Sequence, residues 1–301
     1  MSGVVLGIDA GGSNTRAVAV GESGVVLGRG TAGGANPQSN PPALAAERVL
    51  AAAREALGPR RPDACVLGLA GASSLTDPAV ARLFAGAFEF LRVRVVTDAE
   101  VAFAAGTTAP DGTVLISGTG SIAMRIAGHR RARVGAGFGW LLGDEGSAFW
   151  IGREAVRATL RELQAEQALG ALATSVLRLA LEVDPAGVEQ AELYSRLIRR
   201  VNVDAPIRLA RFAQLVSNAV DPVAAGIRER AAQTLAGEAL AVHEGGPVVL
   251  AGAILGTSVG TRVRELLVGH EVLDTRDGAI GAAWLAAVDV FGANAVPVRE
   301  D

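Results

Sequence analysis

A stretch near the start of the chain combines a carboxylate with glycines and hydroxyl groups. Asp9 ends an apolar run, and the turn after it contains Gly11, Gly12, Ser13, Asn14 and Thr15. Glycines let a backbone approach a phosphate closely and present its N–H groups to the phosphate oxygens. Ser13 and Thr15 add hydroxyl donors for a phosphate. Asp9 could hold Mg2+ through water, because that ion prefers oxygen ligands and keeps several waters. Taken alone, the turn is explained equally well as a tight hairpin whose Gly and Asn satisfy positive-φ positions.

A second turn of this kind lies about a hundred residues further on. Gly118, Thr119 and Gly120 stand between two serines, and Thr119 carries a hydroxyl that could reach a terminal phosphate. Each turn is weak evidence alone, but two such hairpins facing each other across a cleft would clamp a polyphosphate without a lysine. All 28 basic residues are arginine. A lysine-bearing P-loop, a Schiff-base enzyme and a protein kinase with a strand lysine are therefore excluded.

Asp98 stands between an apolar run and a helical segment, residues 99–105. A carboxylate at the end of a strand points into the ligand-binding crevice of many α/β proteins. The position suits a general base, and it suits an ordinary helix N-cap equally well.

Residues 135–147 form a glycine-dense segment with two aromatic side chains and a pair of carboxylates. A loop that wraps a small polar ligand has this composition. The alternative is that Asp144 caps a helix and that Phe138 and Trp140 belong to the core. Asn36, in a separate loop, could supply an amide to sugar hydroxyls, although a plain turn explains it as well.

The elements around these residues predict an α/β fold with two lobes. Two strands flank the first turn within residues 4–20, and residues 114–126 repeat that pattern, which suggests a duplicated domain. Helices are expected at 43–57 and 78–88, with strands at 64–70 and 93–96. We place the first lobe at 1–108 and the second at 109–277, with a helical insertion at about 149–240. A final helix, about 278–292, is expected to pack back on the first lobe.

The composition excludes several classes of protein. A net charge of -3 argues against a nucleic-acid binder, and no apolar stretch reaches the length of a membrane span. Cys65 is the only cysteine, so a cysteine-held cluster within one chain is excluded. His129, His243 and His270 lie apart from each other and from the loops, so they predict no metal site. No basic segment precedes the first apolar run, so we expect a cytoplasmic protein without a secretory signal.

Four motifs together are more specific than any one of them. They are residues 7–13 (GIDAGGS), 97–99 (TDA), 116–121 (ISGTGS) and 143–148 (GDEGSA). In this order they resemble the N-acetylglucosamine kinases, which belong to the larger BadF/BadG/BcrA/BcrD ATPase group. The resemblance runs from about Gly7 to Trp284. It implies a duplicated, two-lobed ribonuclease H-like fold of the actin/hexokinase/Hsp70-like ATPase class, with ATP and Mg2+ in the cleft and a sugar beside the γ-phosphate.

The resemblance also implies roles for individual residues. Asp98 would accept the proton of the sugar 6-hydroxyl, and Asp9 would organise the hydrated metal. The phosphates would be contacted by the two turns, Ser13 and Thr119 among them. The sugar pocket would be lined by Asn36, Gly137, Phe138, Gly139 and Asp144. Residues 251–256 resemble an adenosine-binding turn, which places Gly252 and Gly256 against the nucleotide with Ala210 opposite, although alone this segment is typical of a buried βα turn.

Two positions depart from the animal enzymes of this family. Phe138 stands where we expect a tryptophan, and Trp140 replaces a histidine. These two departures leave the choice of sugar open.

The motifs together predict an ATP-dependent kinase of an amino sugar, first of all N-acetylglucosamine, with glucosamine, N-acetylmuramic acid or glucose as alternatives. An energising ATPase and a non-catalytic sugar or nucleotide sensor are the rivals from other classes. Relatives with this fold often pair, so a homodimer is a further expectation.

Overall fold

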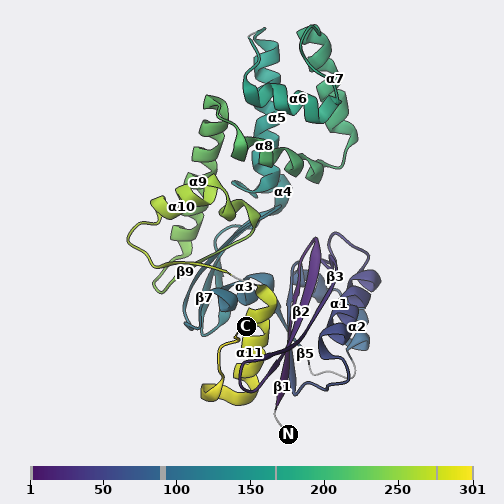
Figure 1. Cartoon of the computed structure of the whole chain (residues 1–301), viewed down its shortest axis with the longest axis vertical. Coiled ribbons are helices and arrows are strands. Elements are labelled where there is room, and N and C mark those ends of the chain that lie inside the picture. The colour runs from purple at the N-terminus through teal and green to yellow at the C-terminus, as the bar shows by residue number, and fades with distance from the viewer. Residues whose placement is uncertain (1–2, 89–92, 167, 276, 300–301) are drawn as a thin grey trace.

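The computed structural model describes residues 3–88, 93–166, 168–275 and 277–299. Two five-stranded sheets form the centres of two lobes, as Figure 1 shows. The first sheet has the order β3-β2-β1-β4-β5, with β1 to β3 antiparallel and β4 and β5 parallel to β1. Its strands are β1 (Val4–Ala10), β2 (Asn14–Gly21), β3 (Val26–Gly33), β4 (Ala64–Leu69) and β5 (Val93–Thr97).

The second sheet repeats this topology. Its order is β10-β9-β6-β7-β8, so β6, β7 and β8 correspond to β1, β2 and β3, and β9 and β10 correspond to β4 and β5. The strands are β6 (Gly112–Ser117), β7 (Ser121–Ala127), β8 (Arg130–Val134), β9 (Val248–Ala251) and β10 (Val272–Asp274). The predicted two-lobed α/β fold with a duplicated domain is confirmed.

Two helices cover one face of the first sheet. They are α1 (Pro42–Leu57) and α2 (Pro78–Ala87), and the short 3-10 helix η1 (Ala72–Thr76) precedes α2. Proline at the first position starts each of the two α-helices, since its missing N–H has no intrahelical partner there. The small apolar face of α1 packs with β1, β2 and β4 into one core.

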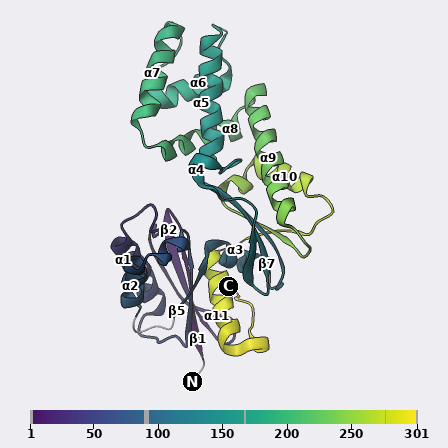
Figure 2. The same ribbon diagram turned by 180° about the vertical axis from the view of Figure 1, so that it is seen from behind.

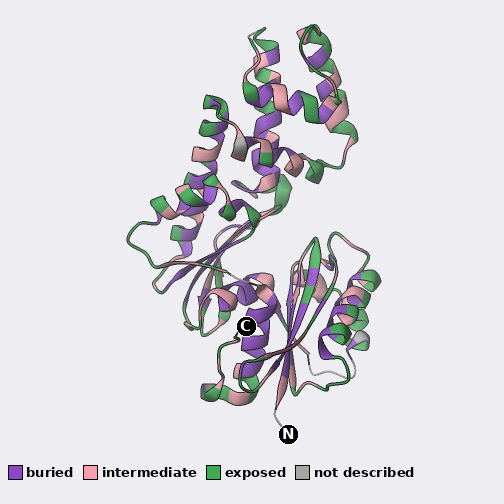
Figure 3. Ribbon diagram, in the orientation of Figure 1, coloured by how far each residue is buried: buried purple, intermediate pink, exposed green. Residues whose placement is uncertain are grey.

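The helices that follow the two sheets exchange sides. α3 (Asp98–Gly106) follows β5, but its Phe103 packs on the second sheet. α11 (Gly278–Phe291) follows β10 and packs on the first sheet. The two helices cross at Gly281, where an added Cβ would lie 2.1 Å from the carbonyl oxygen of Val101. Figure 2 shows this pair beside the first sheet, and Figure 3 shows α11 as largely buried. The lobe limits 1–108 and 109–277 stay predictions.

The remaining helices extend the second lobe away from the first (Figure 1). They are α4 (Gly139–Leu142), α5 (Ala148–Gln164), α6 (Ala171–Leu181), α7 (Gln190–Val203), α8 (Ala213–Asn218), α9 (Pro222–Val242) and α10 (Ser258–Leu266), with η2 (Pro206–Phe212) and η3 (Ala253–Gly256). The short 3-10 helix η4 (Gly292–Asn294) instead follows α11. Asp221 is the N-cap of α9, and its carboxylate accepts hydrogen bonds from the backbone N–H groups of Val223 and Ala224. No helix in the described part of the chain has the length and apolarity to span a membrane.

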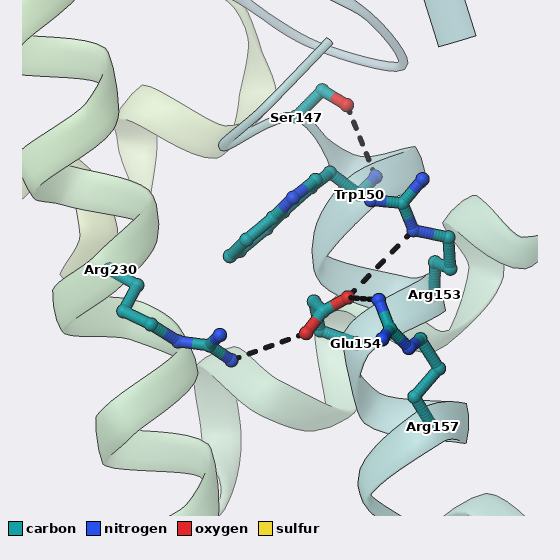
Figure 4. Close-up of polar contacts among 6 residues, drawn as sticks. All are labelled: Ser147, Trp150, Arg153, Glu154, Arg157 and Arg230. Atoms are coloured by element: carbon teal, nitrogen blue, oxygen red, sulfur yellow. Dashed lines mark hydrogen bonds and ion pairs between the residues drawn. The ribbon is translucent and has the colours of Figure 1, made fainter. Parts of the chain in front are cut away.

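A buried carboxylate joins α5 to α9 in this helical part. Glu154 is 5% exposed, and its oxygens lie 2.9 Å from Nη1 of Arg157 and 3.3 Å from Nη2 of Arg230. Nε of Arg153 lies 3.8 Å away, and the Arg230 guanidinium also stacks over the ring of Trp150. Figure 4 shows the three arginines converging on the one carboxylate. The charge that α5 buries is thus neutralised by its neighbours.

Candidate active site

The first glycine turn lies at the carboxyl end of β1, in the middle of the first sheet. Gly11 N–H donates to the carbonyl of Asn14, which closes the turn, and Ala35 N–H donates to the carbonyl of Gly11. The turn residues Gly12, Ser13 and Asn14 are exposed. Gly34 passes so close to the turn that an added Cβ would lie 2.0 Å from the carbonyl oxygen of Gly12. The structure therefore leaves the tip of this turn open to a ligand.

Thr15 differs from its prediction. Its side chain is buried, and its hydroxyl donates to the carbonyl of Gly33 at 2.8 Å. The hydroxyl that we expected at a phosphate instead fastens β2 to β3. Alternation along a strand explains this, because Thr15 points to the opposite face of the sheet from Asn14 and Arg16.

Asp98 is close enough to Asp9 for its negative charge to act on the Asp9 carboxylate. Asp9 is half-buried near the end of β1, where its carboxylate abuts Gly278 at the start of α11. Burial first, and then the negative charges of Asp98 and Asp277, raise the pKa of Asp9 to about 7, while Arg16 opposes the shift. Asp98 is the first residue of α3, and burial raises its pKa as well, against hydrogen bonds from the backbone.

The second glycine turn is braced by the predicted ligand loop. Gly118 N–H donates to the carbonyl of Gly120, and Thr119 is exposed at the tip. Asp144 accepts a hydrogen bond from the backbone N–H of Ser121 at 3.2 Å, and an added Cβ on Gly120 would lie 2.8 Å from its carboxylate. The loop and the turn therefore form one unit at the end of β6.

The third predicted nucleotide segment meets this turn. Gly252 has a φ of 97°, and an added Cβ would lie 2.4 Å from the carbonyl oxygen of Ser117 and 3.1 Å from the nitrogen of Gly118. Gly256 has open space around it. Ala210 lies elsewhere, in η2, where its Cα would be 3.5 Å from a Cβ on Gly152 of α5. Of the three predicted adenosine residues, Gly252 thus packs against the second turn, and Gly256 lies four residues further along the same segment.

The predicted sugar residues fall into two groups. Gly137 and Gly139 have φ values of 97° and 76°, which favour glycine, and between them Phe138 is 70% exposed. Phe138 is thus not a core residue. Asn36 lies in the first lobe, where its Oδ1 accepts a hydrogen bond from the backbone of Gln38 and abuts Gly71. Nothing in these contacts joins the two groups directly.

One protein family model matches most of the chain, including both glycine turns. The family model of the BadF/BadG/BcrA/BcrD ATPases matches residues 6–286. The chain belongs to this family.

Three named proteins are similar to this chain. An N-acetylmuramic acid/N-acetylglucosamine kinase from Clostridium acetobutylicum is 35% identical over 99 residues, which is 33% of this chain and about a third (32%) of that protein. A protein assigned as an N-acetylglucosamine kinase from Chromobacterium violaceum is 25% identical, with a TM-score of 0.75 over 94% of this chain and 98% of that one. A ROK family glucokinase from Streptomyces griseus, 20% identical with a TM-score of 0.59 over 94% and 99% of the two chains, shares the fold.

Sequence reasoning missed two residues near the site of this BadF/BadG/BcrA/BcrD family member, Asp277 and Glu238. Asp277 caps α11 and lies 3.8 Å from Arg16, which faces Asp9 across the β1–β2 pair. Its position after β10 copies that of Asp98 after β5, so the duplication was the signal that could have found it. Glu238 of α9 was also missed. Burial and the charges of Glu145 and Asp144 raise its pKa to about 7.

The carboxylates near the first turn suit a metal ion that binds together with substrate phosphates. No group of three or more His, Cys, Asp or Glu among the described residues is placed to hold a metal ion by itself. Mg2+ commonly binds through one or two carboxylates, several waters and substrate phosphates. A site with Asp9 beside an open glycine turn fits that pattern. A cavity of about 330 Å3 lies at the other end of α3, near Thr107 and Trp284, and is not part of this site.

Proposed function

We propose that this protein is an ATP-dependent sugar kinase that phosphorylates the 6-hydroxyl of an amino sugar, with N-acetylglucosamine as the first candidate. The family assignment and the named kinases among the relatives support the reaction class. The choice of sugar rests on the sequence motifs and on the names of those relatives, and is the finer part of the proposal.

One observation carries the proposal beyond the fold. The duplicated sheets end at corresponding strands, β1 and β6, in exposed turns of glycine and hydroxyl residues, and Asp98 lies within electrostatic reach of the carboxylate beside the first turn. Backbone N–H groups of such turns bind phosphate oxygens without a cationic side chain. Such turns allow a chain without lysine to bind phosphate.

Asp98 would act as the base. Its carboxylate would take the proton of the sugar 6-hydroxyl as the hydroxyl oxygen bonds to the γ-phosphorus of ATP and the bond to the leaving ADP oxygen breaks. Proton removal is late in such a loose transition state, so orientation of the hydroxyl counts for more than basicity. Burial raises the pKa of Asp98, which makes its carboxylate a stronger base than that of an exposed aspartate.

The other residues would bind and orient the substrates. Ser13 and Thr119 would contact phosphates from the two lobes, and Gly252 and Gly256 would leave room for the adenosine. Asp9 would hold the waters of Mg2+, an ion that neutralises phosphate charge when bound. Asp144 would meet a sugar hydroxyl beside the second turn, with Phe138 and Asn36 on either side of the ring. Closure of the lobes would then exclude water.

Two alternatives of other classes are weaker. An energising ATPase with a [4Fe–4S] cluster between subunits needs cysteines, and Cys65 is buried in β4 and is the only one in the chain. A non-catalytic sensor has no need of Asp98 together with both phosphate turns. N-acetylmuramic acid is a closer competitor, because the named Clostridium relative acts on it as well. A cytoplasmic location and a homodimer stay predictions.

The test is a coupled assay of ADP release with Mg-ATP. N-acetylglucosamine, glucosamine, N-acetylmuramic acid and glucose are compared with a control without sugar. Strong turnover on one amino sugar supports the proposal and names the substrate. ATP hydrolysis that does not depend on sugar favours an energising ATPase, and ATP binding without turnover favours a sensor.

A further inference from the structure

Glu100 stands where the first turn of α3 meets the second lobe. Its side chain is buried, with 9% exposed. One carboxylate oxygen, Oε2, accepts hydrogen bonds from the backbone N–H of Thr97 at 2.7 Å and from the Thr97 hydroxyl at 2.8 Å. The other oxygen, Oε1, accepts a hydrogen bond from the backbone N–H of Arg131 at 3.2 Å. One buried carboxylate therefore connects two segments from different lobes.

The bonds to Thr97 fix the start of the helix. Thr97 is the N-cap of α3, and Glu100 N–H donates to the Thr97 hydroxyl at 3.3 Å, so the two residues form a capping box. Asp98 lies between them in the sequence, in the helical turn that these bonds fix. The backbone of this turn carries the Asp98 side chain, so a contact that fixes Glu100 also restricts the position of Asp98.

The bond to Arg131 adds the second lobe. Arg131 belongs to β8, the edge strand of the second sheet, next to a register shift in its pairing with β7. Edge strands have backbone groups that no neighbouring strand uses. β8 leads directly into the glycine-dense segment that begins at Gly135 and carries the proposed sugar residues. A helix cap alone has no need of this contact.

We propose that Glu100 is a positioning residue that ties the orientation of Asp98 to the position of β8, and so sets the base relative to the lobe that carries the sugar loop. The inference rests on the proposed kinase function and on Asp98 as its base. It predicts that breaking the contact slows the chemical step and leaves substrate binding nearly unchanged.

The contact can be broken from the β8 side without altering α3. Arg131→Pro deletes the backbone donor, and an edge strand tolerates proline. Arg131→Ala removes the same side chain but keeps the N–H, so it is the matched control. We expect Arg131→Pro to lower kcat about tenfold relative to Arg131→Ala, with KM for ATP and sugar changed by less than about twofold. Tenfold is about 1.4 kcal/mol, which is near the lower end of what one hydrogen bond to a charged group contributes.

Glu100→Gln provides a second measurement, which also serves if Arg131→Pro does not fold. The single side-chain oxygen of glutamine can accept from Thr97 or from Arg131, but not from both. Burial, and to a smaller extent the charge of Glu100, raise the pKa of Asp98. Removing that charge lowers this pKa, so the acid limb of the kcat profile is expected to move to lower pH. The shift of the acid limb follows from the lost charge alone, so the positioning role is measured by kcat. It predicts a lower kcat per ATP-binding site for Glu100→Gln, whereas a purely structural role would lower the melting temperature and leave this kcat unchanged.

The outcomes distinguish the positioning role from the kinase function. Sugar-dependent ADP release by the wild type, with equal kcat for Arg131→Pro and Arg131→Ala, or with an unchanged kcat per ATP-binding site for Glu100→Gln where Arg131→Pro does not fold, overturns the positioning role alone. Absence of sugar-dependent ADP release by the wild type removes the proposed function and this inference with it. A slower Arg131→Pro with unchanged KM values supports both.

Discussion

Two buried carboxylates of this molecule have opposite surroundings. Glu154 of α5 is paired with Arg157 and Arg230, with Arg153 nearby. Asp9, near the end of β1, instead faces the like charges of Asp98 and Asp277, which together with burial raise its pKa to about 7. The chain thus neutralises one buried charge completely and leaves the other with an excess of negative charge.

The difference separates a structural carboxylate from a functional one. A buried charge costs free energy unless it is paired, so a fold selected only for stability would treat Asp9 as it treats Glu154. Clustered carboxylates with raised pKa values are typical of sites that a cation or a proton completes. We therefore expect the arginines around Glu154 to control stability. Asp9 and Asp98 are expected to control activity, at some cost to stability.

The largest effect is expected at Asp98, on activity. Asp98→Asn should lower kcat for sugar phosphorylation by a factor of about a hundred or more, or about 2.7 kcal/mol, because the amide cannot accept the proton. Binding of ATP and sugar, measured by calorimetry, should change little. Asp77→Asn is the control, since Asp77 also lies at a helix start, but as the N-cap of α2. Near-normal turnover by Asp98→Asn would show that Asp98 is an ordinary residue of the first helical turn and not the base.

The next effect concerns the stability of the helical region. Arg157→Gln combined with Arg230→Gln leaves Glu154 with Arg153 alone, at 3.8 Å. Glu154 then resembles Asp9, and the free energy of unfolding should fall by about 2 kcal/mol, because a buried charge has lost its partners. Urea denaturation measures the change. Adding Glu154→Gln to the double variant should restore part of the loss, and a triple variant that is no more stable would contradict the comparison.

A smaller effect, of the opposite sign, is expected at Asp9. Its pKa is about 7 in the folded protein, against an ordinary aspartate value of 3.8, so the folded chain binds the proton more tightly than the unfolded chain. Stability should therefore fall as pH rises from about 4 to 7. Asp9→Asn removes this loss. The whole shift would correspond to about 4 kcal/mol, but water screens this half-buried carboxylate and reduces the effect. In buffer without divalent metal we therefore expect the variant to be more stable than the wild type by about 1 kcal/mol at pH 8, and the difference to vanish near pH 4. A difference that is independent of pH would contradict the assignment.

The fold was largely predictable from repeated local signals. Two apolar hairpins around Gly-rich turns predicted the duplicated sheets, and proline or aspartate at the breaks marked the ends of several helices, as at Asp221. The exchange of α3 and α11 between the lobes was not predictable in detail. It depends on Gly281 and Val101 meeting across helices that are far apart in the sequence.

Site positions that need glycine for close backbone contact were easier to predict than positions whose role depends on where a side chain points. An added Cβ on Gly252 would meet the backbone of Ser117, and one on Gly34 would meet the carbonyl oxygen of Gly12. Thr15 was expected at a phosphate, yet strand alternation turns its hydroxyl to Gly33. Asp277 and Glu238 were missed because their importance comes from neighbours that lie more than ninety residues away, such as Asp9 and Asp144.

The smallest expected effect isolates the two halves of the Glu154 network. Arg157 is 52% exposed and sits one turn from Glu154 on the same helix, so its ion pair forms within α5 and is screened by water. Arg157→Gln alone should lower the free energy of unfolding by less than about 0.5 kcal/mol. Arg230→Gln should cost more, although Arg230 is 55% exposed, because it joins α9 to α5 and covers Trp150. Equal losses measured by urea denaturation would mean that charge alone stabilises the network, and that packing between the helices contributes nothing to it.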